Sequence, residues 1–221
     1  MNLLSKRESR DKLLMLLIVV ALSVSSLAWV HADRTPPPWD PSDHLRFAYD
    51  YYQPLAHFDF KGFYREFFLA EHFYAPLVHL ITACFFLIFG PTRSSGILVN
   101  ILSLGVLMAA VSWMGNRLFA NKSVSTIHRE STEPGVSESD KNDDLETGSA
   151  RSNNSGLVFS AGALAAIFTA CYHFPAWLLH DAFLDFPLIA AVAATFALLI
   201  RADDFKDRRR ALQFGVAAGL G

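Results

Sequence analysis

Long stretches without a charged side chain are the feature that most constrains how this chain can fold. They run over Leu13–Val30, Phe73–Gly90, Ser94–Asn116 and Leu157–His180, and only Asp185 interrupts a further one, Phe183–Ile200. A helix needs about 20 mostly apolar residues to cross the hydrocarbon core of a bilayer, where every backbone amide must be paired within the segment. The sequence therefore predicts an all-α fold, a polytopic bundle of transmembrane helices.

Composition agrees with this class. Apolar residues of the AVILMFWYC set make up 52% of the chain and charged residues 18%, against about 25% charged in a typical soluble protein. The net charge of −2 provides no field that would attract a nucleic acid, so we expect none as a partner. Cys84 and Cys171 lie inside apolar stretches and are interpreted as small hydrophobic residues.

The apolar stretches and the polar segments between them divide the chain into five parts. We expect a basic head with a first transmembrane helix, an outer loop with juxtamembrane helices, a second and third apolar segment, a disordered polar insert, and a fourth and fifth segment with the start of a sixth. These parts cover residues 1–30, 31–72, 73–120, 121–156 and 157–221. The insert is rich in Ser and acidic residues and lacks aromatic residues, which is typical of disorder. The sixth segment begins at Ala211 and is cut short at Gly221, so we expect the chain to be the N-terminal part of a longer protein.

Positive charge predicts the orientation of the chain in a cell membrane. The basic residues before Leu13 predict a cytoplasmic N-terminus, and Arg208–Arg210, after the fifth segment, also predict a cytoplasmic position. The first segment is interpreted as an anchor, because it exceeds the roughly 7–15 apolar residues of a cleaved signal peptide. Two cytoplasmic ends require an even number of crossings, but there are five segments. Either Phe73–Gly90 is a re-entrant or juxtamembrane helix on the outer side, or the charge signal misleads at one end. Both solutions place residues 33–70 outside.

The outer loop carries acids at the expected start of a helix. Asp40 has the position of an N-cap, Pro41 the first helical position and Asp43 the third, which predicts a reciprocal capping arrangement. The aromatic residues that follow, with Arg46 among them, are typical of a helix in the bilayer interface. These interpretations explain the loop without any chemistry.

The same acids are also candidates for catalysis. A carboxylate held at a helix start can act as a general base toward a hydroxyl group, so Asp40 and Asp43 are the candidate catalytic residues. His44 and Arg46 beside them are candidates for binding substrate. Asp181 and Asp185, near the outer end of a span, form a second candidate binding pair, or else a water-exposed turn.

The histidines at positions 72, 79 and 173 are not expected to bind a metal, because no tight spacing of Cys, His or Asp surrounds any of them. The sequence therefore assigns no metal ligands. It leaves the cofactor unknown, with a divalent cation as one possibility.

Four short motifs occur in an order that resembles a known family. They are Trp39–His44, Tyr74–Gly90 with its Pro76-Leu77 start and Phe89-Gly90 end, Leu184–Leu188, and the glycine-rich Gly215–Gly221. The pattern resembles the bacterial relatives of dolichyl-phosphate-mannose–protein mannosyltransferases, including the lipid A aminoarabinose transferases, which have the GT-C membrane fold. The chain departs from the family pattern where Ala75 replaces the first of two prolines, where His44 replaces a Glu, and in the insert.

The resemblance implies inverting transfer of a sugar from a polyprenyl-phosphate donor to a lipid, glycan or protein acceptor outside the membrane. A loop acid would be the base, and two alignments compete for it, Asp40 and Asp43, with a slight preference for Asp40. Asp185 would position the acceptor, the donor or a metal, and Arg46 would meet the donor phosphate or lie at the interface. The alternative is a non-catalytic multi-pass membrane protein, either transporter-like or a remnant with a role in assembly.

Overall fold

The structure of this protein, a computed structural model, describes residues 3–69, 76–130, 159–172, 177–181, 184–202 and 204–220. Every regular element within these ranges is a helix, which confirms the predicted all-α class. The helices are α1 (Leu3–Ala32), α2 (Trp39–Ala56), α3 (Phe60–Phe68), α4 (Pro76–Phe89), α5 (Arg93–Gly96), α6 (Leu98–Glu130), α7 (Ala161–Cys171), α9 (Asp185–Ala202) and α10 (Arg208–Leu220).

Three helical stretches are long and apolar enough to cross a membrane. They are Glu8–Ala32 in α1, Arg93–Phe119 over α5 and α6, and Asp185–Ala202, which is α9. They correspond to the first, third and fifth apolar segments predicted from the sequence. These helices support the predicted membrane class.

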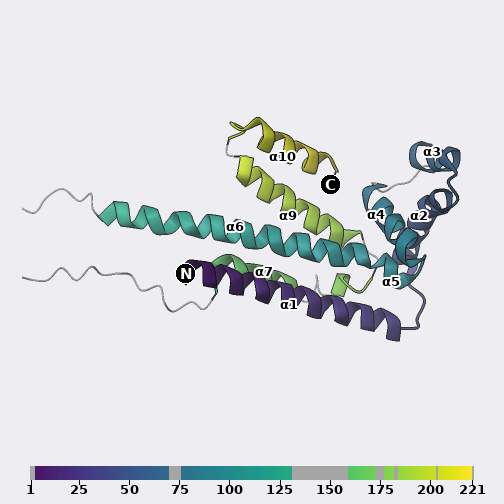
Figure 1. The fold of residues 1–221 in the computed structure, drawn as a ribbon, viewed down its shortest axis with the longest axis horizontal. Helices are drawn as coiled ribbons and strands as arrows, with labels where there is room; N and C mark the ends of the chain where they lie inside the picture. Colours follow the sequence, from purple (N-terminus) through teal and green to yellow (C-terminus); the bar gives the residue numbers. More distant parts are fainter. Residues whose placement is uncertain are drawn as a thin grey trace, which may run out of the picture.

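The two remaining apolar helices are too short to cross a bilayer unaided. α4 has 14 residues and α7 has 11, and a helix of 14 residues is only about 21 Å long, against a hydrocarbon core of about 30 Å. In Figure 1, α4 lies with α2, α3 and α5 at one end of the long helices, whereas α7 lies alongside α1 and α6. We call α2–α5 the cap, and the end of the bundle that it covers the cap end.

Two boundaries differ from those expected. The predicted fourth segment, Leu157–His180, is not one helix, because α7 ends at Cys171 and Tyr172 has an extended backbone with ψ 139°. In the sequence a proline follows at position 175, and a proline disfavours a helix that continues through it, since its ring clashes with the carbonyl group four residues earlier. At the other boundary α6 continues to Glu130, so the first part of the predicted polar insert 121–156 is helical. Residues 131–156 lie outside the described residues.

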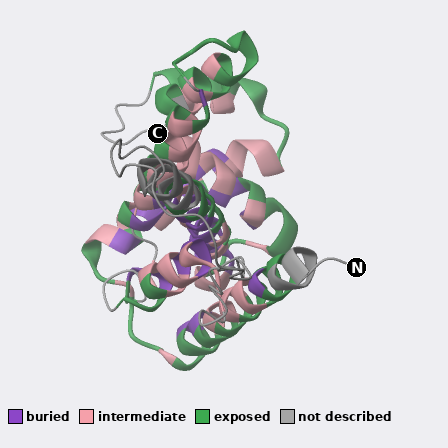
Figure 2. Ribbon diagram, turned by 90° about the vertical axis from the view of Figure 1, so that its left-hand side faces the viewer, coloured by how far each residue is buried: buried purple, intermediate pink, exposed green. Residues whose placement is uncertain are grey.

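α6 is the central helix of the bundle, and α7 and α9 pack against it. The core consists of apolar side chains from α6, α7, α9 and the turn between the last two, with part of α1 packed against it. Its buried members are Leu104, Leu107, Met108, Ala166, Ala170, Leu178, Leu179, Phe186 and Ala190. The other side of α1 leaves large apolar side chains such as Leu16 and Val24 exposed, and Figure 2 shows this helix, which begins at the label N, largely in the colour of exposed residues. Such a surface suits contact with lipid.

The crossing of α6 and α7 depends on two glycines. A Cβ atom on Gly162 would lie 2.0 Å from the backbone oxygen of Ser112, and one on Gly115 would lie 2.7 Å from the Cα atom of Gly162. The side-chain oxygen of Asn116 accepts a hydrogen bond from the Gly162 N–H at 3.1 Å. Small residues allow this approach of two backbones, as is common where membrane helices pack.

We expect Gly162→Ala to destabilise the protein by about 1–2 kcal/mol, because the added methyl group must push the two helices apart. Gly105→Ala, also in this bundle, is the matched control, since a Cβ atom at Gly105 meets no atom within 4 Å; it should be neutral or slightly stabilising. The free energies of unfolding can be compared by detergent-induced denaturation. Equal stability of the two variants would show that the α6–α7 crossing is not tight.

The cap is built on the pairing of α2 with α4. Ala48 and Tyr51 of α2 and Ala83 and Phe86 of α4 are buried there. Between α4 and α5 the chain reverses at Gly90, whose φ of +84° favours glycine. α3 packs its Phe63 and Phe67 rings near Tyr51 and leaves its other aromatic residues exposed. The location of this aromatic surface in the bilayer interface stays a prediction.

Candidate functional site

The acids of the cap lie at the start of α2, but not in the predicted capping arrangement. The N-cap is Pro38 and the helix begins at Trp39, so Asp40 lies inside the first turn, and no side chain caps this end. The reason is that the backbone N–H of Ser42 donates to the Pro38 carbonyl at 3.1 Å, which starts the helical hydrogen bonds two residues before Asp40. The predicted capping role of Asp40 and Asp43 is therefore wrong. Both carboxylates remain available for other partners.

Asp40 faces a pair of buried histidines. Its Oδ1 atom lies 3.6 Å from Nε2 of His44, one helical turn further along α2. Nδ1 of His44 lies 3.1 Å from Nε2 of His79 in α4, and both rings are buried. Because a hydrogen bond between two ring nitrogens needs one donor and one acceptor, these two nitrogens share a single proton. Asp40, His44 and His79 thus form a polar chain from the partly exposed start of α2 into the cap, in which the hydrogen bond is the one between the two histidines.

The surroundings of His44 determine which form of its ring is favoured. Burial lowers the pKa of His44 below its ordinary value, and the carboxylates of Asp40, Asp185 and Asp43 oppose this to a lesser extent. The neutral imidazole is therefore favoured near pH 7. The neutral ring shares a proton with His79 through Nδ1, and its Nε2 atom lies beside the Asp40 carboxylate at 3.6 Å, which is longer than a hydrogen bond.

The lowered pKa of His44 predicts a loss of stability in mild acid. The unfolded chain binds a proton at the ordinary pKa of about 6.5, but the folded chain resists this, so stability should fall as the pH falls below that value. We expect the loss between about pH 7.5 and pH 5.5 to be smaller in His44→Gln than in the wild type. His57→Gln, at an exposed histidine that caps the same helix, is the control. An equal loss of stability in the wild type and in His44→Gln would contradict the lowered pKa of His44.

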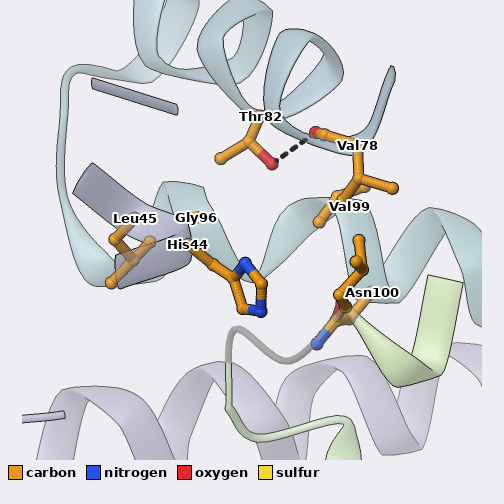
Figure 3. A pocket seen from close by; sticks show the side chains of 8 residues that line it. His44, Leu45, Val78, Thr82, Gly96, Val99 and Asn100 are labelled. Carbon is orange, nitrogen blue, oxygen red and sulfur yellow. Dashed lines mark hydrogen bonds between the residues drawn. The ribbon is translucent and has the colours of Figure 1, made fainter. Parts of the chain in front are cut away.

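A narrow cavity separates His44 from Asn100 of α6. Thr82, Val99 and Leu184 also line it, and Figure 3 shows the His44 ring directed toward Asn100 across the space. The side-chain oxygen of Asn100 is buried and has no hydrogen-bond partner among the described residues. The amide nitrogen of Asn100 donates to the backbone oxygens of Leu178 and Asp181, at 3.2 and 2.6 Å. Asn100 therefore joins α6 to the turn before α9 and faces His44 across the cavity.

A second polar group, centred on Arg93, fastens the cap to the bundle. The guanidinium group of Arg93 lies 3.1 Å from Asp33, at the end of α1, and 3.0 Å from Asp181, before α9. It also donates to the backbone oxygen of Thr35 at 3.2 Å. The three charged side chains are less than one fifth exposed. Hydrogen bonds from Thr35 and the nearby guanidinium lower the pKa of Asp33 below its ordinary value, which keeps it ionised.

The structure separates the six predicted site residues into three groups. Asp40 and His44 are in contact, and Asp185, the first residue of α9, lies near enough to act on the charge of His44. Asp181 belongs to the Arg93 group instead. Asp43 and Arg46 form a loose pair at 3.9 Å, in which the arginine is 65% exposed, and the Arg46 guanidinium lies over the ring of Phe47. An exposed pair of this kind is weak and leaves both residues accessible.

Sequence reasoning missed Arg93, Asp33, Asn100 and the partnership of His79. The available signal was an isolated arginine in the turn before a long apolar stretch, since such a charge needs a partner near a membrane. His79 is a histidine inside an apolar stretch, 35 residues from His44. The spacing of residues in the sequence does not show that the two rings are in contact.

Among the residues that the structure describes, no group of three or more His, Cys, Asp or Glu side chains could hold a metal ion. The arrangement suits proton transfer at a carboxylate instead, because Asp40 is partly exposed and is backed by a buried histidine.

Searches with family models, among curated proteins and among solved structures found no match to this chain.

Proposed function

We propose that this protein is an integral membrane glycosyltransferase of the GT-C type, which transfers a sugar from a polyprenyl-phosphate donor to an acceptor on the extracytoplasmic side. The observation that carries the proposal is the position of Asp40. Its carboxylate is partly exposed, lies at the cap end of long apolar helices, and is backed by buried His44. A base at such a place can reach a polar substrate while the substrate's lipid chain remains in the membrane.

The reaction requires a positioned base. As the acceptor hydroxyl oxygen attacks the anomeric carbon, its proton passes to the Asp40 carboxylate, and the bond to the polyprenyl phosphate breaks with the electron pair leaving on the phosphate. The first turn of a helix favours an ionised carboxylate, because its free N–H groups carry partial positive charge. Asp43 is the alternative base, and its greater exposure and loose pairing with Arg46 leave it less firmly oriented.

The proposed orientation places the cap outside the cell membrane and the N-terminus in the cytoplasm. The start of α1 and the junction of α9 with α10 lie at the same end of the bundle, away from the cap (Figure 1). This end carries Lys12, Arg117, Arg201 and the cluster Arg208–Arg210, as expected for a cytoplasmic face. The short α4 then lies at the outer surface. An even number of crossings requires the fourth apolar segment, of which α7 forms only 11 residues, to cross as well, together with the three long helices.

Cysteine labelling tests this orientation. In a background without Cys84 and Cys171, both of which are exposed, Pro91→Cys should react with an impermeant maleimide added to intact cells. Lys206→Cys, between α9 and α10, should react only after the membrane is opened. Both positions are exposed in the structure, so access within the fold is equal. Labelling of residue 91 from the cytoplasm alone would contradict the proposed topology.

The proposed activity is tested by transfer of a radiolabelled sugar. Full-length protein in lipid nanodiscs should transfer label from a polyprenyl-phosphate sugar, and not from a nucleotide sugar, to a membrane-extract acceptor. A non-catalytic multi-pass protein, the alternative, predicts no transfer from either donor. The absence of transfer over a panel of hexose and pentose donors would refute the proposal.

A further inference from the structure

A second, larger hollow lies at the cap end, on the side of the bundle where α1 ends. It has a volume of about 400 Å³ and opens between the end of α1, the start of the cap and the turn before α9. Trp29, Trp177 and His180 supply its aromatic walls, and Asp33, Arg93 and Asp181 its charged side. We call it the tryptophan cleft. Its volume is that of a site for a small organic ligand.

The charges of the tryptophan cleft limit which ligand it can take. Two carboxylates, Asp33 and Asp181, share one guanidinium, so the group carries a net charge of −1. An anionic group would be repelled by the net charge and would have to displace a carboxylate from Arg93. A simple cation would instead lie close to a guanidinium that faces the same space. The balance therefore favours a ligand that is neutral and hydrogen-bonding.

The hydrogen-bonding groups of the cleft are only partly used. Asp33 accepts bonds from Arg93 and from both the backbone and the hydroxyl of Thr35. Asp181 contacts Arg93 through Oδ1, and its Oδ2 atom has no hydrogen-bond partner among the residues that the structure describes. Since the Asp181 side chain is 18% exposed, that oxygen remains able to accept a bond from a ligand hydroxyl.

The aromatic walls offer flat apolar surface beside this acceptor. Trp29 and Trp177 are 58% and 50% exposed, and the ring of His180 meets the Trp29 ring edge-on with centroids 5.8 Å apart. An indole ring combines an apolar face with a polar N–H edge. Such walls suit a ligand with one apolar face and a rim of hydroxyl groups.

We propose that the tryptophan cleft binds a sugar ring. The C–H face of a pyranose packs against an indole, and its hydroxyl groups bond to Asp181 and to the Arg93 group. The assignment of this ring to the donor or the acceptor rests on the proposed glycosyltransferase function, whereas binding of the ring itself does not. The cleft is separate from the Asp40–His44–His79 chain, so binding and proton transfer can be tested apart.

Saturation-transfer NMR on the full chain in nanodiscs measures this binding. The probes are methyl glucoside, methyl mannoside and methyl arabinoside, compared with glucuronate, inorganic phosphate and tetramethylammonium. We expect saturable transfer to the ring protons of at least one methyl glycoside, and weaker binding of glucuronate because of the net charge of −1. Trp177→Ala and Asp181→Asn should each weaken binding by about five- to tenfold. Trp113→Phe, at a tryptophan outside the cleft, should bind as the wild type does.

The outcomes separate this proposal from the proposed function. Failure of all three methyl glycosides to bind the wild-type protein saturably would overturn it, as would saturable binding of tetramethylammonium or phosphate alone. Unchanged sugar binding in both Trp177→Ala and Asp181→Asn, with normal helix content by circular dichroism, would also overturn it. Asp40→Asn should bind sugar as the wild type does. Binding without any transfer activity would refute the proposed function and leave the cleft assignment standing.

Discussion

Asp40→Asn should lower the rate of sugar transfer by about 10²–10⁴-fold, which is the usual contribution of a general base. The amide keeps the size and shape of the carboxylate but cannot accept the proton of the acceptor hydroxyl. Because Asp40 is partly exposed and its contact with His44 is 3.6 Å long, the substitution should hardly change stability. The measurement is initial transfer rate from a polyprenyl-phosphate sugar, with membrane insertion and helix content as checks on the fold.

Asp43→Asn is the matched control for this prediction. Asp43 lies in the same helix and is half exposed, with Arg46 as its partner at 3.9 Å. If Asp40 is the base, Asp43→Asn should retain most of the activity. Loss of activity in Asp43→Asn with normal turnover in Asp40→Asn would assign the base to Asp43, and normal turnover in both would exclude a carboxylate base in this loop.

Arg93→Met should destabilise the protein by about 2–3 kcal/mol. The substitution removes the guanidinium that neutralises Asp33 and Asp181, so the two carboxylates repel each other. Each of these side chains is less than one fifth exposed, so water screens the repulsion only in part. Breaking a fully buried pair costs about 3–5 kcal/mol, and the residual exposure reduces this. Since Arg93 also joins the end of α1 to the turn before α9, proteolysis at the cap end should become faster. Detergent-induced unfolding measures the free energy.

Arg46→Met tests whether that cost belongs to the Arg93 group in particular. Arg46 is also an arginine of the cap paired with an aspartate, but its side chain is 65% exposed and the pair is 3.9 Å long. An exposed ion pair contributes about 0–1 kcal/mol. Similar destabilisation by Arg93→Met and Arg46→Met would mean that the Arg93 group does not fasten the cap to the bundle.

Apolar length predicted the long helices well, because a charge-free stretch near 20 residues has few alternatives to a membrane helix. α1, α6 and α9 lie where Leu13–Val30, Ser94–Asn116 and Phe183–Ile200 were expected. The same criterion predicted too long a helix for α7, because hydropathy reports apolar residues and contains no information on where a helix ends. The helix stops at Cys171 although apolar residues continue beyond it.

The site was predictable only where its residues are close in the sequence. Asp40 and His44 are four residues apart, so one helix brings them together. His44 and His79 are 35 residues apart, and Arg93 lies 60 residues from Asp33 and 88 from Asp181. These contacts arise from the packing of α2 on α4 and from the way in which α1, α5 and the turn before α9 meet at the cap end. No local pattern of spacing contains that information.

Transfer in sealed vesicles of known orientation tests the central claim most directly. With full-length protein and a polyprenyl-phosphate sugar in the membrane, an acceptor confined to the cap side should become labelled, and Asp40→Asn should abolish the labelling. An acceptor confined to the side of the N-terminus should stay unlabelled. Labelling only on the N-terminal side, or no labelling on either side with any donor, would contradict the proposal that the cap end is the outer active site of a lipid-linked sugar transferase.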